Sequence, residues 1–445
     1  MSKTTITRRN LLKGMGATAG LAGISSLGFP RFLAASEATT AQAASPWYET
    51  QFIADPLMNE RVIWFLDHTW EHMAAVSEVL DIVSRIEPGN NESWMREWFQ
   101  TADQLRAVGD ASAQKGHPLS AGESYLRACG YYLAGLIYGT SGDDPEIRRT
   151  AQASADCFQQ ALNLLNIPGE AVEIPYEDSA LPAYFFRSPL ATGPAPVLIA
   201  HQGMDASVEE NLFLAQECVK RGYHCLLLHH PGQGLALRLK GLTYRPDWEN
   251  VITPVVDYVI AQLEVDPERI ALMGISFGGA LVTRAVAFEK RIKICIANPA
   301  VYSWWDFISA FLFGSNPELG QLLDSDPDAF NTAMQGFLDQ APPMYSWWME
   351  AAMWKWGSSS PADLLTKLKA YTNADIADKV TCTMLVMDGE GETWAAGQAQ
   401  KLYDALTCPK EYMLFTAEDT GLLHCQTGAM AVGSQRLFDW LEENL

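Results

Sequence analysis

Apolar positions recur every three or four residues through the first third of the chain, and this spacing predicts amphipathic helices in residues 46–168. The pattern then changes to short, continuous runs of Val, Ile and Leu, in residues 169–300 and again in residues 373–445. Such runs, alternating with stretches long enough for helices, predict an α/β fold with a mostly parallel sheet covered on both faces. Residues 301–372 interrupt this alternation and are rich in Trp, Phe and Tyr, so we expect a helical cap inserted between two strands.

Local signals mark some helix boundaries in the first region. A helical apolar pattern runs through residues 61–86 without an obvious break. Ser120 and Glu123 fit a capping box, and Asp144 followed by Pro145 fits an N-cap with a proline in the first turn. These signals predict that the N-terminal helical domain contains several helices.

Residues 1–43 are expected to be a targeting segment outside the fold. Arg8 and Arg9 precede an apolar run rich in Gly and Ala, and small residues at 41–43 offer a cleavage site. This arrangement is typical of a twin-arginine (Tat) signal peptide; the alternative is a basic tail with an N-terminal helix. We therefore expect export to the periplasm or the exterior. No later apolar run approaches the about 20 residues that cross a bilayer, so no membrane span is expected in the mature chain.

Composition narrows the classes of partner. The chain has 445 residues, 48% of them hydrophobic, and a formal net charge of −22. So acidic a surface, without a basic patch, argues against binding to nucleic acids or anionic membranes. The eight cysteines lack CxxC spacing, which favours buried thiols over a disulfide framework, with one or two bridges left open.

The stretch Gly274–Gly278 fits G-x-S-x-G, the pattern of a nucleophile elbow. An apolar strand pattern precedes it and a helical pattern follows it, which is the context that the elbow requires. The sharp turn needs small residues two positions either side of the serine. Ser276 is therefore predicted to be a nucleophile; the alternative is a tight turn that contains a serine by chance.

The elbow fold requires an acid after a later strand and then a histidine. The usual position of the acid, three residues past the strand-end Gly389, is occupied by Glu392. Glu390 is the alternative acid, whereas Asp388 is expected to lie within the strand. His424 is the one histidine after the acid, and it lies between the last strand pattern and the closing helix.

An oxyanion hole needs two backbone N–H groups directed at the developing negative charge. One is expected from Phe277, directly after the serine. The other is expected from the loop after the strand that ends near residue 200, with Met204 favoured over Gly203. His201 in that loop is expected to be structural.

Two other sequence patterns could indicate a metal site or a phosphate-binding loop. His68, Glu71 and His72 match H-x-x-E-H, a zinc-peptidase pattern, but no third ligand is evident downstream. Lining of a substrate cleft is the favoured interpretation of these residues. The glycine-rich stretch 229–234 lacks the Lys-Ser/Thr of a phosphate-binding loop and is expected to be a turn. We therefore expect no metal and no organic cofactor.

The chain resembles the α/β-hydrolases that carry an N-terminal helical domain. This group includes the fermentation–respiration switch protein family, 2,6-dihydroxypseudooxynicotine hydrolase and fungal hydrolases that shorten polyketide pigments. The resemblance covers essentially the whole mature chain and rests on AVEIPYEDSALPAYFFRS, HQGMDAS, HHPGQG, GISFGG, DGEGETWAAGQAQKLYDAL and LLHCQTGA. It implies an active site between the helical domain and the core, and several members cleave a carbon–carbon bond next to a ketone.

The resemblance also implies an acidic residue near the substrate at the start of the cap. Asp306 is the candidate, and a solvated helix carboxylate is the alternative. Gly203, Trp304 and Trp305 are further expected to line the substrate pocket. Glu392 departs from the family's usual aspartate, and the Tat signal departs from the cytosolic relatives.

Together these features predict a serine hydrolase that acts on a small, apolar or aromatic ester or ketone. A homodimer is a further expectation. An amidase or peptidase, and a non-catalytic binding protein of the same fold, are the alternatives. A peptidase would need a carboxylate pair to bind the free amino terminus of its substrate, and the sequence identifies none. A vestigial site would have lost a member of the triad, and none is lost.

Overall fold

The computed structural model describes residues 46–314 and 316–445. The predicted signal segment, residues 1–43, lies outside the described residues, so export stays a prediction. Eight strands form one sheet in the order β1-β2-β4-β3-β5-β6-β7-β8. The strands are β1 Gly169–Tyr176, β2 Ser179–Phe186, β3 Ala195–His201, β4 His224–Leu228, β5 Val265–Ile275, β6 Ile294–Asn298, β7 Thr383–Gly389 and β8 Lys410–Phe415.

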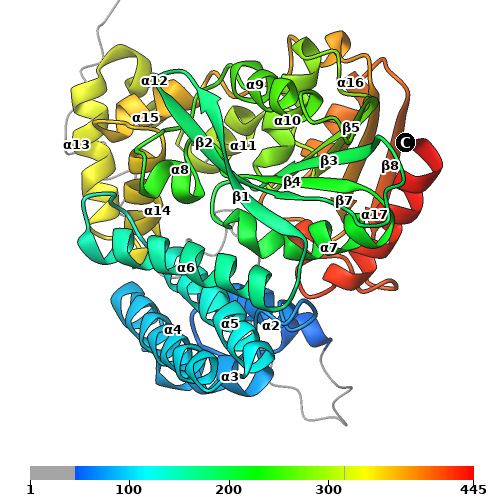
Figure 1. Ribbon diagram of the computed structural model, residues 1–445. Helices are drawn as coiled ribbons and strands as arrows, with labels where there is room; N and C mark the ends of the chain where they lie inside the picture. The colour runs from blue at the N-terminus through cyan, green and yellow to red at the C-terminus, as the bar shows by residue number, and fades with distance from the viewer. Residues whose placement is uncertain (1–45, 315) are drawn as a thin grey trace, which may run out of the picture.

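The helices fall into three groups (Figure 1). The N-terminal group is α2 Pro56–Asp67, α3 Val76–Arg85, α4 Asn91–Gln114, α5 Pro118–Leu136 and α6 Pro145–Leu164. The sheet is flanked by α7 Leu212–Lys220, α8 Gly234–Arg238, α9 Glu249–Ile260, α10 Gly278–Phe288, α16 Gln398–Ala405 and α17 Met430–Asn444. Between β6 and β7 lie α11 Trp304–Phe313, α12 Pro317–Ser325, α13 Pro327–Leu338, α14 Pro343–Lys355 and α15 Pro361–Leu368. None of the helices among the described residues is long and apolar enough to span a membrane.

The sheet is parallel from β4 to β8, and the β1–β2 hairpin pairs antiparallel to β4 at one edge. Every residue of β3, β4 and β6 is buried, which explains their continuous apolar sequences. Alternate residues of β3 enter two different cores: Leu198 packs with α7, α17 and the N-terminal helices, and Ile199 packs with α9, α10 and the cap. The predicted α/β sheet with helices on both faces is confirmed.

Two local predictions in the N-terminal region were wrong. The helical pattern of residues 61–86 is broken between α2 and α3, where His72 adopts a positive φ of 64°. The capping box at Ser120 does not form, because α5 begins two residues earlier with Pro118 at its first position. The Asp144 cap is confirmed, since its side chain accepts a hydrogen bond from the Glu146 N–H.

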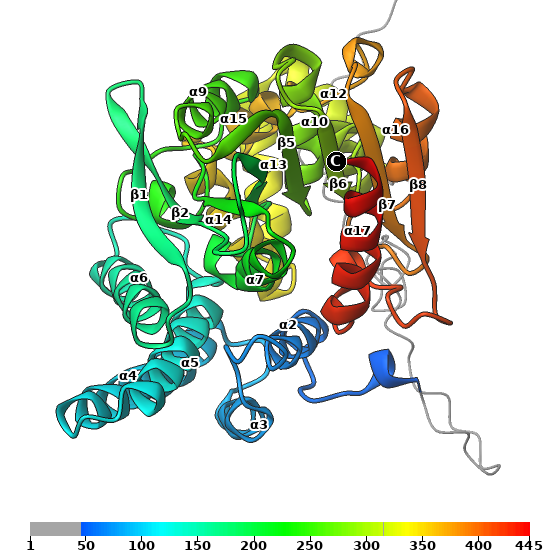
Figure 2. The same cartoon turned by 45° about the vertical axis from the view of Figure 1, so that its right-hand side comes forward.

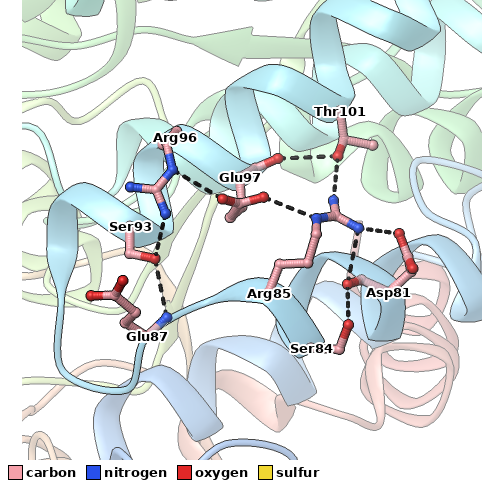
Figure 3. A network of polar contacts seen from close by, with 8 residues as sticks. All are labelled: Asp81, Ser84, Arg85, Glu87, Ser93, Arg96, Glu97 and Thr101. Atoms are coloured by element: carbon pink, nitrogen blue, oxygen red, sulfur yellow. Dashed lines mark hydrogen bonds and ion pairs between the residues drawn. The ribbon is translucent and has the colours of Figure 1, made fainter.

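A network of polar contacts ties α3 to α4 (Figure 3). Glu97 on α4 accepts hydrogen bonds from Arg85 Nε at 2.9 Å and from Arg96 Nε at 3.0 Å. Arg85 also donates to Thr101, and the Ser93 hydroxyl accepts from the Glu87 N–H at 3.0 Å. The network fixes the turn between the two helices, whose other faces pack into the core shared with the sheet.

All eight cysteines are free thiols, five of them buried. This agrees with the expectation of buried thiols rather than a disulfide framework.

The turn between β5 and α10 is sharp and closely packed. Ser276 at its apex has a φ of 58°, a conformation that L-residues adopt rarely and at some cost in strain. Helix α10 begins so near to β6 that a Cβ on Gly279 would lie 2.1 Å from the carbonyl oxygen of Pro299. Only a glycine therefore allows the helix to approach the strand this closely.

We expect Gly279→Ala to destabilise the protein by about 3 kcal/mol, because the methyl group forces the backbones apart. The matched control is Gly336→Ala in α13, where an added Cβ meets nothing within 4 Å and should instead stabilise by about 0.5–1 kcal/mol. Urea unfolding of both variants measures the difference. Equal stabilities for the two variants would contradict the packing described here.

Candidate active site

Three side chains meet at the carboxyl ends of the parallel strands. Ser276 follows β5, Glu392 follows β7 and His424 follows β8. His424 Nε2 lies 2.9 Å from Ser276 Oγ, and His424 Nδ1 lies 2.7 Å from Glu392 Oε2. A hydroxyl, an imidazole and a carboxylate in this series can pass a proton from the hydroxyl to the imidazole. The structure thus brings together the three residues that the sequence singled out.

The carboxylate of Glu392 is fixed by its own loop. Its Oε1 accepts hydrogen bonds from the N–H groups of Trp394 at 2.7 Å and Ala395 at 3.0 Å. The residue is 9% exposed. Burial raises the pKa of Glu392, whereas His424 and the two N–H groups lower it. The lowering is the larger effect, so the net pKa is below its ordinary value. The group is a carboxylate at neutral pH.

The two acids that precede Glu392 in the sequence point elsewhere. Glu390, the alternative acid, accepts from the Ala417 N–H at 3.1 Å, and no hydrogen bond joins it to His424 within the described part of the chain. Asp388 lies within β7, as predicted, and accepts from the Tyr412 hydroxyl at 2.6 Å. The geometry therefore separates Glu392 from its neighbours.

The loop that carries His424 is tied to the serine turn through Asn298 at the end of β6. Asn298 Nδ2 donates to Gln426 Oε1 at 2.8 Å, and the Asn298 carbonyl accepts from the Ser276 N–H at 2.6 Å. Cys425 and Gln426 both have positive φ, which turns the loop sharply back after the histidine. Burial lowers the pKa of His424, whereas Cys425 and Glu392 raise it, and the net shift is upward.

The loop after β3 lies against the serine turn. A Cβ on Gly203 would lie 2.6 Å from the backbone nitrogen of Phe277, so no side chain fits there. Phe277 and Met204 both line the cavity at Ser276. Within residues 46–314 and 316–445, no hydrogen bond uses the N–H group of either residue. Two backbone donors are therefore available beside Ser276, as an oxyanion hole requires.

Asp205, the next residue of this loop, is an ion-pair centre that sequence reasoning missed. Its carboxylate lies 2.6 Å from Arg61 Nη2 and 3.0 Å from Lys355 Nζ. Lys355 also donates to the Met204 carbonyl at 2.7 Å. Burial raises the pKa of Asp205, but the two cations outweigh it and the net pKa is lowered.

One face of α2 reaches all three loops of the site. Glu60 accepts from the Trp394 indole N–H at 2.9 Å, Arg61 pairs with Asp205, and Asp67 accepts from the Met430 N–H at 3.0 Å. Figure 2 shows α2 below α17, whose first residue is Met430. The N-terminal helices are therefore part of the site's framework.

A cavity opens over Ser276 between the core, α2 and the cap. Its lining includes Ser276, His424, Gly203, Met204, Phe277, Glu60, Arg61, Trp64, Asp67, Trp304, Trp347, Trp348 and Trp394. Gly203 and Trp304, two of the residues expected at the substrate pocket, are among them. The cap and loop tryptophans other than Trp304 were missed, because their aromatic side chains look the same whether they line a cavity or fill a core.

Two predicted pocket residues are placed elsewhere. Asp306 is exposed on α11, at a shallow surface depression that it shares with Ser309 and Lys401, and it does not line the cavity at Ser276. Trp305 instead contacts Phe313 edge-on, and Lys369 lies over its ring. Helix α11 buries Trp304 and so turns Asp306, two residues later, to its opposite side. The helical period was the signal that could have shown this.

The H-x-x-E-H pattern has a structural role. His68 lies between two buried carboxylates: it bonds to Glu71, and its Nε2 lies 3.4 Å from Glu210 Oε2. His72 is exposed after the turn, and none of the three pattern residues lines the cavity at Ser276. In the described part of the chain, no group of three or more His, Cys, Asp or Glu side chains is arranged to hold a metal.

Two protein-family models match the chain. A model described as "Alpha/beta hydrolase family" matches residues 197–427, and one described as "Esterase FrsA-like" matches residues 54–305. The chain belongs to the FrsA-like α/β-hydrolases. The second match begins in the N-terminal helices, so it covers both the helical region and the first half of the hydrolase core.

The relatives of this α/β-hydrolase include fungal enzymes. It is 32% identical over 399 residues to hydrolase acrC of Aspergillus aculeatus, covering 83% of this chain and 92% of the relative. It is 29% identical over 400 residues to the 20-hydroxy-prefusarin hydrolase FUS2 of Gibberella moniliformis, with the same coverage. The crystal structure of 2,6-dihydroxy-pseudo-oxynicotine hydrolase matches with a TM-score of 0.66 at 17% identity, over 85% of this chain and 95% of that one. These likenesses confirm the predicted fold and family.

The buried His68 predicts a pH-dependent stability. Burial lowers its pKa, but Glu210 and Glu71 raise it to about 10, well above the 6.5 of the unfolded chain. Between pH 6.5 and pH 10, the folded state therefore binds one proton more than the unfolded state. The stability that His68 contributes is fully present below pH 6.5 and is lost as the pH rises toward 10. Urea unfolding of the wild type and His68→Phe at pH 6.5, 8 and 9.5 measures this: the stability gap between them should shrink as pH rises. A constant gap would mean that His68 is neutral in the folded protein.

Proposed function

We propose that this α/β-hydrolase is a serine hydrolase in which Ser276, His424 and Glu392 act as nucleophile, base and orienting acid. The observation that carries the proposal is the continuous series of hydrogen bonds from Ser276 through His424 to Glu392. The fold family supports hydrolysis, and the relatives named above are themselves hydrolases.

In the first half-reaction, Ser276 Oγ attacks the substrate carbonyl carbon and His424 Nε2 takes the hydroxyl proton. The N–H groups of Phe277 and Met204 stabilise the oxyanion that forms. The intermediate collapses to an acyl-enzyme, and the leaving group takes the proton from His424. Glu392 keeps Nδ1 protonated and stabilises the imidazolium.

In the second half-reaction, water attacks the acyl carbon and gives a proton to His424. Collapse of the second intermediate releases the acid and returns the proton to Ser276. Apart from the substrate and this water, the proposed cycle uses side chains and backbone groups of the chain.

The substrate is proposed to be a small, largely apolar molecule with an ester or a ketone next to the cleaved carbon–carbon bond. The tryptophans of the cavity support an apolar or aromatic substrate. The two reactions share the oxyanion chemistry and differ in the atom that His424 or water must protonate, oxygen in one case and carbon in the other.

Ser276→Ala is expected to lower turnover by about 10⁴-fold or more on whichever substrate set the wild type hydrolyses. The sets are p-nitrophenyl esters and aryl β-diketones, each followed by mass spectrometry of the products. Serine-dependent cleavage of the diketones alone establishes carbon–carbon hydrolysis, and cleavage of the esters alone establishes an esterase. Turnover that survives in Ser276→Ala would refute the proposed nucleophile.

The acid is tested by a matched pair of substitutions in one loop. Glu392→Gln removes the charge that faces His424 and should lower kcat by about 10⁴-fold. It should also move the acidic limb of the pH–rate profile to lower pH, because loss of the carboxylate lowers the pKa of His424. Glu390→Gln, two residues away, should keep both the rate and the limb. Equal effects of the two substitutions would disprove the assignment of Glu392.

A further inference from the structure

A second cavity lies within the cap, beside the one at Ser276. It is enclosed by α11, α13 and α14 and by the Thr393–Trp394 loop, and Leu57 of α2 contributes from the N-terminal region. Its lining consists of aliphatic, aromatic and methionine side chains together with Thr393, and no charged side chain lines it among the described residues. A cavity of this composition provides few hydrogen-bond partners for water and therefore favours an apolar ligand.

The two cavities share a wall. Trp304, Trp347, Trp348 and Trp394 line both of them. The cavity at Ser276 has a volume of about 130 Å³. An apolar cavity of about 150 Å³ holds a single benzene ring. A substrate larger than about one ring therefore needs additional space, and the cap cavity, with a volume of about 60 Å³, is the adjoining space.

The shared wall also carries unused hydrogen-bond donors. The indole N–H groups of Trp304 and Trp347 are buried and have no hydrogen-bond partner among the described residues. These side chains are 7% and 4% exposed. Buried donors normally find an acceptor, so a molecule that brings an oxygen to this wall would complete their bonding.

We propose that the cap cavity is a subsite for an uncharged, apolar chain of the substrate, reached from Ser276 past the four shared tryptophans. The inference rests on the proposed function for the position of the reacting carbonyl. It adds that the natural substrate is elongated: a carbonyl at Ser276, and a short alkyl chain that extends into the cap between α11, α13 and α14.

The test is a binding series that needs no turnover. n-Alkyl phenyl ketones, from acetophenone to octanophenone, carry the carbonyl and a chain of increasing length. Their dissociation constants are measured by calorimetry on the full chain and on Ser276→Ala. We expect the Kd to fall by about fourfold for each added CH₂ until the cap cavity is filled, since each methylene leaves water.

Two substitutions in α13 change the cavity in opposite directions. Leu338→Trp fills part of it and should raise the Kd of octanophenone relative to acetophenone by about 10-fold. Phe337→Ala enlarges it and should extend the chain-length dependence to longer ketones. The control is Gln335→Trp, on the exposed side of the same helix, which adds equal bulk outside the cavity and should leave the ratio near that of the wild type.

A Kd that does not depend on chain length, or equal ratios for Leu338→Trp and Gln335→Trp, would overturn the subsite. If Leu338→Trp does not fold, Phe337→Ala decides alone: an unchanged length limit overturns the proposal. Failure of the proposed function is a separate result, because it appears as turnover that survives in Ser276→Ala while the binding series is unaffected.

Discussion

The partly buried carboxylate of Asp205 holds together three regions that are distant in the sequence. Asp205 belongs to the core loop that carries the proposed oxyanion donor, Arg61 comes from α2, and Lys355 comes from the end of α14 in the cap. Removal of one member would leave buried charge without compensation, which costs about 3–5 kcal/mol. The charges are therefore stable only when the N-terminal helices and the cap are both in place against the core.

The 3-10 helix Val208–Asn211 that follows this loop is fixed in the same way. Glu209 lies 3.3 Å from His229 Nε2, in the loop after β4, and Glu210 faces His68 from the N-terminal region. Ser207 and Glu210 form a capping box at its start. The segment after β3 thus has charged anchors at Asp205 and at Glu209 and Glu210. Met204 lies between the end of β3 and the first of these anchors, so its main chain has little freedom to move. A preorganised donor of this kind is what stabilisation of an oxyanion requires, since it costs no reorganisation during the reaction.

Much of this architecture was predictable because it depends on local pattern and chain order. The G-x-S-x-G turn, the acid after β7 and the histidine after β8 occur at positions that the fold reserves, and the structure brings Ser276, Glu392 and His424 within hydrogen-bond distance. Arg61 and Lys355 were not predictable, since a single cation in an amphipathic helix looks like a solvent-facing residue until the packing is known. The break after α2 was hidden for a related reason: the apolar period is the same on both sides of the turn. Asp306 shows the opposite case, because the helical period alone places it away from Trp304.

The same contacts show that the N-terminal helices and the cap position the loops of the site as well as covering the hydrolase core. Helix α2 bonds to the acid loop through Glu60, to the oxyanion loop through Arg61 and to the histidine loop through Asp67. It also contributes Trp64 to the cavity wall. A shift of α2 would therefore move the loops that carry all the proposed catalytic groups except Ser276 and Phe277, and would reshape the space that a substrate occupies. Because a misplacement of about 1 Å can cost about 10²-fold in rate, docking of the N-terminal helices is a condition for chemistry as well as for binding. The cap has the matching role on the other side, where Lys355 holds the Met204 carbonyl and Trp347 and Trp348 close the cavity.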